Sequence, residues 1–484
     1  MGVSNLPQVL RLHPAQAEAL RFGGRGTTYG DLDALAVRCA ALAWHDWGVR
    51  PGDRVAWLGA SHLAQIALLF GLARIGAILL PLNFRLAVPE WKRLIADCTP
   101  RHLVHDADWA QAAGELDLAL HPVDELLAAP AGATPDHARA EAPALLVSTS
   151  GTTGGPKAAV HTQANLLANM QIAAAAQAMT PEDTVLTVLP LFHVGGLCIQ
   201  TLPALYAGAR VLLHPRFQPE ETLAAIANEK PTLTLQVPAT MQALVAHPRW
   251  AATDLTGLRA VWAGSSILPS ALVQAFHARG VPVCNVYGAT ETGPFSIALP
   301  PEHAFGHVGS CGWPVAPVEA RLGTAHGDAA ELLVRGPNVV RRYWPDLPAC
   351  DDQGWFATGD LAQQASDGSY RIVGRARDLI ISGGENIHPV EIEEVLSEHP
   401  AVAECAAFGL PDGRWGELVA VAVVLRSPVE EAELAAHLAG RLARFKLPRK
   451  WVWMEALPKT ALGKVQRSAL ARAGGVAART DPTI

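Results

Sequence analysis

The sequence predicts an α/β fold, with a large N-terminal domain of parallel sheets covered by helices, a small β-rich unit and a small α+β C-terminal domain. Three observations predict it. Short apolar strands alternate with amphipathic helices from about residue 28 to residue 278. After Pro300, glycines, prolines and short strands dominate, and a last segment of helices and strands begins near residue 378. Alternation of strands and helices is typical of parallel sheets whose faces are covered by helices.

In the N-terminal domain, apolar periodicity and turn residues place the elements. The expected helices are 28–45, 62–74, 163–176, 219–229, 238–246 and 269–278. The expected strands are 54–58, 77–82, 144–148, 185–188, 209–213, 232–236 and 258–262. The β-rich unit ends near residue 375, and the charged segment Gly374–Asp378 is the expected linker. Beyond it we expect helices at 389–398 and 430–443 and strands at 402–408 and 418–425.

Composition indicates a globular protein of two or more domains. The chain has 484 residues, of which 50% are hydrophobic and 17% charged, so it can bury a large core. A net charge of −7 offers no electrostatic basis for binding nucleic acid. Seven scattered cysteines with no CxxC pair favour free thiols in a reducing compartment over disulfides or zinc.

The N-terminus lacks the apolar core of a signal peptide. The longest apolar stretch, from about Leu63 to Leu82, contains Gln65 and Arg74, so we interpret it as a helix followed by a strand and not as a membrane span. We therefore expect a cytoplasmic enzyme without integral membrane contact. A homodimer stays open as its assembly.

A loop rich in glycine and hydroxyl side chains follows the strand at 144–148. The run from Ser148 to Lys157 contains three glycines, five hydroxyl residues and one lysine. Glycine allows backbone N–H groups to approach an anion, and hydroxyls and lysine add donors and charge. This is the chemistry of a phosphate-binding loop. It differs from the common nucleotide P-loop, which ends in Gly-Lys-Ser/Thr.

Five further motifs follow this loop. They are Pro190–Gly196 (PLFHVGG), Asn285–Gly293 (NVYGATETG), Gly354–Asp360 (GWFATGD), Gly374–Pro389 (GRARDLIISGGENIHP) and Pro458–Arg467 (PKTALGKVQR). In this order, the loop and the motifs resemble the acyl-adenylate-forming (AMP-binding) superfamily, in its acyl- and aryl-CoA synthetase branch. The resemblance implies two domains, 1–376 and a mobile 377–484, with a hinge near Arg377.

The resemblance also implies the reaction and its substrates. A carboxylic acid and ATP form an acyl-adenylate and pyrophosphate, and the thiol of coenzyme A then takes the acyl group and releases AMP. Mg²⁺ accompanies ATP, and Glu291 is the expected metal ligand because Mg²⁺ prefers carboxylate and phosphate oxygens. The catalytic residues implied are Lys464, Glu291, Thr290 and His193. Lys464 would stabilise the charge that develops on the phosphates during adenylation.

Further residues are expected to bind the substrates. For ATP they are Thr149, Ser150, Gly151, Thr152, Thr153, Gly154, Lys157, Tyr287, Gly288, Asp360 and Arg375. For CoA they are Gly383, Gly384, Trp415, Phe445, Lys446, Arg449 and Arg85. For the acyl group they are His193, Val194, Val237, Ala239, Ala263, Gly264, Gly288 and Ala289. Acetate-activating relatives carry tryptophan at the position of Gly288, so a larger acid, a medium- or long-chain fatty acid or an aromatic carboxylate, is favoured.

Alternatives stay open at this point. A stand-alone adenylating enzyme would load a carrier-protein thiol, and a 2-succinylbenzoate-type CoA ligase would take a different acid. A binding protein without catalysis is disfavoured because Lys157, Glu291, Asp360 and Lys464 are all present. A luciferase-like reaction has no support in the sequence.

Overall fold

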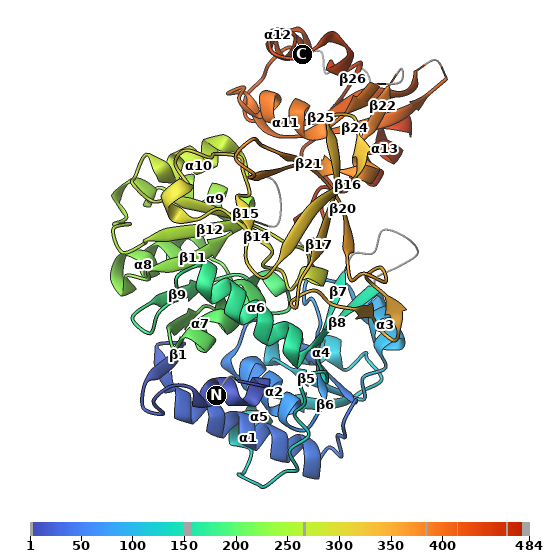
Figure 1. Cartoon of the computed structure of the whole chain (residues 1–484). Helices are drawn as coiled ribbons and strands as arrows, with labels where there is room; N and C mark the ends of the chain where they lie inside the picture. The colour runs from blue at the N-terminus through green and yellow to red at the C-terminus, as the bar shows by residue number, and fades with distance from the viewer. Residues whose placement is uncertain are drawn as a thin grey trace. The chain divides into compact units, whose positions relative to one another are not determined.

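The computed structural model describes residues 3–149, 157–264, 268–382, 385–413, 415–460 and 463–476 (Figure 1). The chain forms two compact units. The first consists of Met1–Leu268, Leu272–Ala320 and Val334–Phe356, and the second of Pro269–Ala271, Arg321–Leu333 and the chain from Ala357 onward. A boundary at residue 377 and a hinge at Arg377 stay predictions.

The larger sheet of the first unit has nine strands. Their spatial order is β15 (Trp313–Pro314), β14 (Ile297–Ala298), β13 (Val283–Tyr287), β12 (Ala260–Gly264), β11 (Leu233–Gln236), β9 (Thr184–Thr187), β10 (Arg210–Leu213), β1 (Glu18–Phe22) and β2 (Arg25–Thr28). The strands from β13 to β1 run parallel, which confirms the predicted sheet type. Their carboxyl ends therefore meet at one edge.

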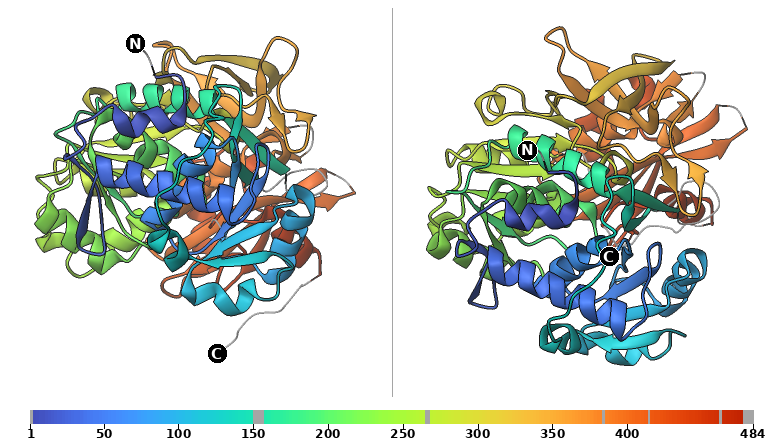
Figure 2. Two further views of the ribbon diagram at one scale, coloured as in Figure 1. Left: turned by 90° about the horizontal axis from the view of Figure 1, so that it is seen from below. Right: turned by 60° about the horizontal axis from the view of Figure 1, so that its bottom comes forward.

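One face of this sheet is covered by α8 (Pro219–Glu229), α9 (Pro238–Val245) and α10 (Ser270–His277). The turned views in Figure 2 show these yellow-green helices together on one side of the unit. The apolar cluster that joins helices and strands includes Leu223, Met241, Leu244, Phe276, Leu186 and Val261. Burial of such side chains contributes about 1.5–3 kcal/mol each.

The second sheet of the first unit has eight strands. Their spatial order is β19 (Leu347–Pro348), β18 (Arg342–Tyr343), β8 (Lys157–Thr162), β7 (Pro143–Thr149), β4 (Ile78–Pro81), β3 (Arg54–Leu58), β5 (His102–His105) and β6 (Ala119–Pro122). Strands β7 to β6 are parallel, whereas β8 and β18 add antiparallel pairs at one side. The short helices beside it are α3 (Val88–Cys98), α4 (Ala110–Ala113) and α5 (Val123–Ala128).

The two longest helices of the first unit begin at or one residue after the predicted start. Thr28 caps α1 (Tyr29–His45) and Thr162 caps α6 (Gln163–Ala176), each by accepting a backbone N–H bond at its side chain. Helix α2 (Leu63–Arg74) is buried on all sides from Ala64 to Ala73, as a helix surrounded by protein should be. No helix among the described residues is long and apolar enough to cross a membrane.

The second unit contains most of a four-stranded sheet and a separate αβ segment. The four strands are β16 (Glu319–His326), β17 (Ala329–Arg335), β20 (Phe356–Gln364) and β21 (Tyr370–Arg375). The αβ segment comprises β22 (Ile380–Ser382), β23 (Glu385–Ile387), α11 (Pro389–Ser397), β24 (Val402–Asp412), β25 (Gly416–Leu425), α12 (Glu431–Ala439), β26 (Lys450–Trp453) and α13 (Arg467–Val476). Helix α12 ends at Ala439, with Gly440 as its C-cap, and so stops before the predicted residue 443.

Candidate active site

The predicted phosphate loop joins two antiparallel strands. Strand β7 ends at Thr149 and β8 begins at Lys157, and these residues pair with each other in the sheet. The Thr149 hydroxyl also donates a hydrogen bond to the Lys157 carbonyl at 3.2 Å. The other predicted phosphate ligands, Ser150, Gly151, Thr152, Thr153 and Gly154, lie outside the described residues. The chain leaves this loop as a strand, unlike the helix of the common P-loop.

Tyr343 contacts both Lys157 and Glu291. The Lys157 ammonium lies 5.3 Å from the centroid of the Tyr343 ring. The Tyr343 hydroxyl donates to Oε1 of Glu291 at 2.9 Å. Burial, together with the adjacent Glu291 carboxylate, raises the pKa of Tyr343, so its hydroxyl stays protonated. Sequence reasoning identified Lys157 and Glu291 but missed Tyr343, which belongs to none of the motifs.

Glu291 fits the role of a magnesium ligand by its chemistry. It lies in the short helix η5 (Thr290–Thr292) directly after β13, and its side chain is partly exposed. The turn is closed by a 2.9 Å hydrogen bond from the Ala289 amide to the Thr292 hydroxyl. Within the described residues, Tyr343 is the one side chain that bonds to the carboxylate, through one of its two oxygens. Carboxylate oxygens are the donors that Mg²⁺ prefers.

Two buried asparagines hold the segment that follows Glu291. Asn169 donates to the Cys198 carbonyl at 2.6 Å and accepts from the Phe295 amide at 3.1 Å. Asn338 donates to the carbonyl oxygens of Thr292 at 2.5 Å and Phe295 at 3.1 Å. Buried backbone groups that leave a regular ladder need such partners. The asparagines thus fix the backbone next to the predicted metal ligand.

Glycine is required at the ends of β12 and β13 because another backbone segment passes close to each position. A Cβ on Gly288 would lie 1.6 Å from the carbonyl oxygen of Pro294, and one on Gly264 would lie 2.4 Å from that of Val286. A side chain at either position would force the backbone to move. Gly288 is therefore needed by the fold, in addition to its predicted role beside the acyl group.

The predicted acyl-pocket residues follow neighbouring strands of the nine-stranded sheet. His193 and Val194 follow β9, Val237 and Ala239 follow β11, Ala263 and Gly264 end β12, and Gly288 and Ala289 follow β13. Strands β9, β11, β12 and β13 are consecutive in space and parallel, so these segments all leave the same edge. Ligands bind at this edge in open α/β sheets.

A π-helix follows His193. The His193 Nδ1 accepts a hydrogen bond from the Gly195 amide at 3.0 Å, and η3 (Gly195–Thr201) leads into α7 (Leu202–Ala207). A Cβ on Gly196 would lie 2.4 Å from the carbonyl oxygens of Leu189 and Pro190, so this turn packs tightly on the preceding segment. Turns of π-helix are rare and occur often at functional sites. The sequence carried no signal for it.

The two predicted ribose ligands are neighbours in the second unit. Asp360 in β20 is paired with Arg375 in β21, and their side chains form an ion pair of 2.8 Å. The Thr358 hydroxyl accepts a hydrogen bond from the Asp360 amide at 3.0 Å, which fixes the backbone next to the Asp360 carboxylate. A carboxylate and a guanidinium in contact can accept from and donate to the hydroxyls of one sugar.

Lys464 is exposed on a tight turn of the second unit. The Thr460 amide donates to the Lys464 carbonyl at 2.7 Å, and the Lys464 amide donates to the Thr460 hydroxyl at 3.2 Å. Arg467 anchors the following helix: its guanidinium bonds Glu393 at 2.6 Å, Asp378 at 3.3 Å and the Ala407 carbonyl at 3.0 Å. This anchoring joins the lysine-bearing turn to the segment that includes the predicted hinge.

The predicted CoA ligands divide between the two units. Arg449 stacks 4.5 Å from the Trp415 ring, and Phe445 is 42% exposed. Lys446 is ion-paired with Glu391, a partner that sequence reasoning did not anticipate. Arg85 lies in the first unit, where burial lowers its pKa. Gly383 and Gly384 lie outside the described residues.

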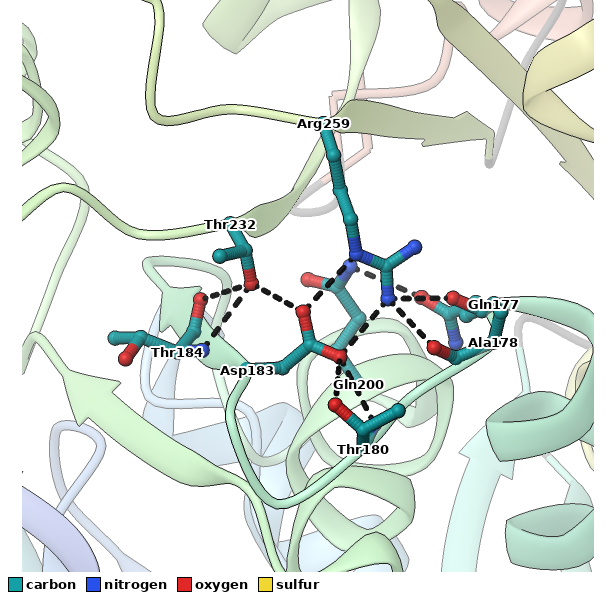
Figure 3. Close-up of polar contacts among 8 residues, drawn as sticks. All are labelled: Gln177, Ala178, Thr180, Asp183, Thr184, Gln200, Thr232 and Arg259. Carbon is teal, nitrogen blue, oxygen red and sulfur yellow. Dashed lines mark hydrogen bonds and ion pairs between the residues drawn. The ribbon is translucent and has the colours of Figure 1, made fainter.

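A polar network at the opposite strand ends is structural (Figure 3). Arg259 bonds both carboxylate oxygens of Asp183 at 3.0 Å, and the Thr232 hydroxyl donates to the same carboxylate at 2.6 Å. Burial by itself would raise the pKa of Asp183, but these bonds outweigh it and lower the pKa. These residues directly precede β12, β9 and β11, so they join the amino ends of the strands. The predicted acyl-pocket residues lie at the opposite, carboxyl ends of the same strands.

Two family models match this chain. The family model for the AMP-binding enzyme matches residues 7–344, and that for the AMP-binding enzyme C-terminal domain matches residues 391–464. The chain is 41% identical over 480 residues to indoleacetate–CoA ligase of Aromatoleum aromaticum, covering 93% of both proteins. It is 37% identical to feruloyl-CoA synthase of an Amycolatopsis species, covering 96% of this chain and 97% of that one.

Solved structures agree with the fold. ATP-bound MatB from Rhodopseudomonas palustris superposes with a TM-score of 0.89 at 29% identity, covering 97% of this chain and 99% of that one. The o-succinylbenzoate-CoA synthetase of Bacillus subtilis, solved with its acyl-adenylate intermediate, gives 0.89 at 30% identity, covering 97% and 98%. The fold and these matches define an AMP-forming acid–thiol ligase. The chain belongs to the AMP-binding enzyme family, in its acyl- and aryl-CoA synthetase branch.

Proposed function

We propose that this enzyme is an ATP-dependent ligase that joins an aromatic carboxylic acid to coenzyme A. The observation that carries the proposal is the likeness, over nearly the whole chain, to ligases named for indoleacetate and ferulate. The residues at the acyl edge support it. Apart from His193 they are small or apolar. Gly264 and Gly288 must be glycine because a Cβ at either position would clash with a backbone carbonyl oxygen. Such residues suit a flat, apolar acid.

In the first half-reaction the acid attacks the α-phosphate of ATP. Lys157 and the loop that precedes it hold the phosphates, Tyr287 packs on the adenine, and Asp360 and Arg375 hold the ribose. Glu291 holds Mg²⁺, whose charge, when the ion is bound, offsets that of the phosphates. Thr290 and Lys464 donate to phosphate oxygens, and donors aimed at developing charge lower the barrier. The products are the acyl-adenylate and pyrophosphate.

In the second half-reaction the thiolate of CoA attacks the acyl carbonyl. The carbon–sulfur bond forms as the carbonyl–phosphate oxygen bond breaks, and AMP leaves with both bonding electrons. Trp415, Phe445 and Arg449 would hold the CoA nucleotide, because aromatic faces and cations suit adenine and phosphate. Residues 377–484 would move about Arg377 between the two steps. His193 would line the acyl site beside Val194.

The test is AMP release with ATP, Mg²⁺ and CoA over a panel of acids. The panel contains arylacetates, hydroxycinnamates, benzoates, fatty acids of increasing length and 2-succinylbenzoate. We expect the highest kcat/KM among the arylacetates or hydroxycinnamates. A peak among fatty acids or at 2-succinylbenzoate would overturn the aromatic assignment. Pyrophosphate exchange without CoA-dependent AMP release would instead indicate a carrier-protein thiol as acceptor.

A further inference from the structure

Tyr343 joins the two oppositely charged groups that we assign to the metal–ATP complex. Its hydroxyl bonds to Oε1 of Glu291 at 2.9 Å, and its ring lies 5.3 Å from the Lys157 ammonium. Among the ion pairs of the described residues, none joins Lys157 to Glu291. The tyrosine side chain therefore contacts both charged groups, the carboxylate through its hydroxyl and the ammonium through its ring.

The backbone fixes this tyrosine against both groups. Tyr343 pairs with Ala159 in β8, the strand that begins at Lys157, and the adjoining Trp344 amide donates to the Ala158 carbonyl at 2.7 Å. On the other side, the Val340 amide donates to the Glu291 carbonyl at 2.8 Å. Its position is thus set by the end of the phosphate loop and by the turn that carries Glu291.

A direct ion pair between Lys157 and Glu291 would compete with the ligand. Opposite charges in a partly buried site attract strongly, and the pair would have to break before either group met phosphate or metal. A tyrosine hydroxyl is a neutral donor that satisfies one carboxylate oxygen and leaves the other available. Its aromatic face accommodates the ammonium without neutralising it.

We propose that Tyr343 is a positioning residue that keeps Lys157 and Glu291 apart and holds the Glu291 carboxylate ready for the metal–nucleotide complex. The inference rests on the proposed function, because it takes Glu291 as the metal ligand. The inference goes beyond that function because Tyr343 lies outside the motifs. Tyr343 acts through Glu291 and Lys157, and it does not touch the reacting atoms.

The test measures binding of Mn²⁺, as a paramagnetic substitute for Mg²⁺, to the enzyme in the presence of a non-hydrolysable ATP analogue. Electron paramagnetic resonance reports the free Mn²⁺ at each point of the titration. Tyr343→Phe keeps the ring and removes the hydroxyl, so we expect Mn²⁺ affinity to fall about tenfold. Tyr343→Leu also removes the ring, and we expect it to weaken binding of the analogue as well. Tyr206→Phe is the matched control and should leave both affinities unchanged.

A Glu291→Gln variant separates this inference from the proposed function. If Glu291→Gln weakens Mn²⁺ binding and Tyr343→Phe does not, the positioning role is wrong while the metal assignment stands. If neither variant changes Mn²⁺ binding, the metal assignment fails and the inference fails with it. A lower melting temperature of Tyr343→Phe at unchanged Mn²⁺ affinity would show a merely structural tyrosine and would overturn the proposal.

Discussion

We propose that Lys464 stabilises the charge that develops on the phosphates during adenylation. Its ammonium is exposed on a turn closed by Thr460, so replacing it should not disturb the core. Lys464→Ala should lower the rate of acyl-adenylate formation by on the order of 10²–10³. CoA transfer from chemically prepared acyl-adenylate should stay within about twofold of the unmodified enzyme, since that step needs no new charge on pyrophosphate. Equal losses in both half-reactions would contradict the role, and Lys92→Ala, at another exposed lysine, is the control.

Asn169 should matter for stability and for the geometry of the site. Asn169→Ala leaves the Cys198 carbonyl and the Phe295 amide without their partner in a buried region. Each unsatisfied group costs about 1–3 kcal/mol, so the free energy of unfolding should fall by about 2 kcal/mol or more. Chemical denaturation measures the change. The control is Asn228→Ala at an exposed position of α8, which should leave the free energy of unfolding almost unchanged. An equal free energy of unfolding for both variants would show that Asn169 does not stabilise the backbone after Glu291.

The sequence motifs predicted the charged residues of the site and missed their neutral partners. Lys157, Glu291, Asp360 and Arg375 lie in recognisable runs, and the structure places the last two in contact. Tyr343, Asn169 and Asn338 come from unrelated segments, and only the folded chain brings them to the site. The Glu391 partner of Lys446 could not be anticipated either, because the two residues are far apart in sequence.

Strand β8 contains a histidine that should make the stability of the protein depend on pH. His161 in this strand is fully buried, and neither ring nitrogen has a hydrogen-bond partner within the described part of the chain. Burial lowers the pKa of His161 from 6.5 to about 4. Between these values the unfolded chain binds more protons than the folded chain, so the free energy of unfolding falls as the pH decreases.

A His161→Leu variant removes this contribution. Between about pH 7 and about pH 5 its melting temperature should fall less than that of the unmodified enzyme, because one fewer buried imidazole opposes protonation. Differential scanning calorimetry at several pH values measures both curves. Parallel curves over this range would show that protonation of His161 is not coupled to unfolding.

Elements with strong periodicity were predictable, and elements defined by their neighbours were not. Helices α1, α6 and α8 begin and end within a residue of their expected bounds, because Thr28 and Thr162 cap the first two and Pro219 begins the third. The π-helix η3 has no local sequence signal, and its Gly196 packs closely on the carbonyl groups of Leu189 and Pro190, which precede it. The antiparallel pairing of β8 with β18 joins segments far apart in sequence, which periodicity cannot reveal.

For the molecule as a whole, we propose that the acid is activated at the α-phosphate of ATP. The fold class and the family agree with this claim, whereas the identity of the acid and the movement of residues 377–484 are proposals. The predicted metal ligand Glu291 and phosphate ligand Lys157 belong to the first unit, and the predicted ribose ligands and Lys464 belong to the second. Activity should therefore require the intact chain.

Transfer of oxygen from the acid to AMP tests whether the acid is activated at the α-phosphate. An arylacetate or hydroxycinnamate labelled with ¹⁸O in its carboxylate is converted with ATP, Mg²⁺ and CoA, and the products are analysed by mass spectrometry. Attack of the carboxylate on the α-phosphate leaves one labelled oxygen on AMP when the thiol displaces it, and we expect one ¹⁸O per AMP with unlabelled pyrophosphate. Label in pyrophosphate or inorganic phosphate, or ADP as the nucleotide product, would contradict activation at the α-phosphate.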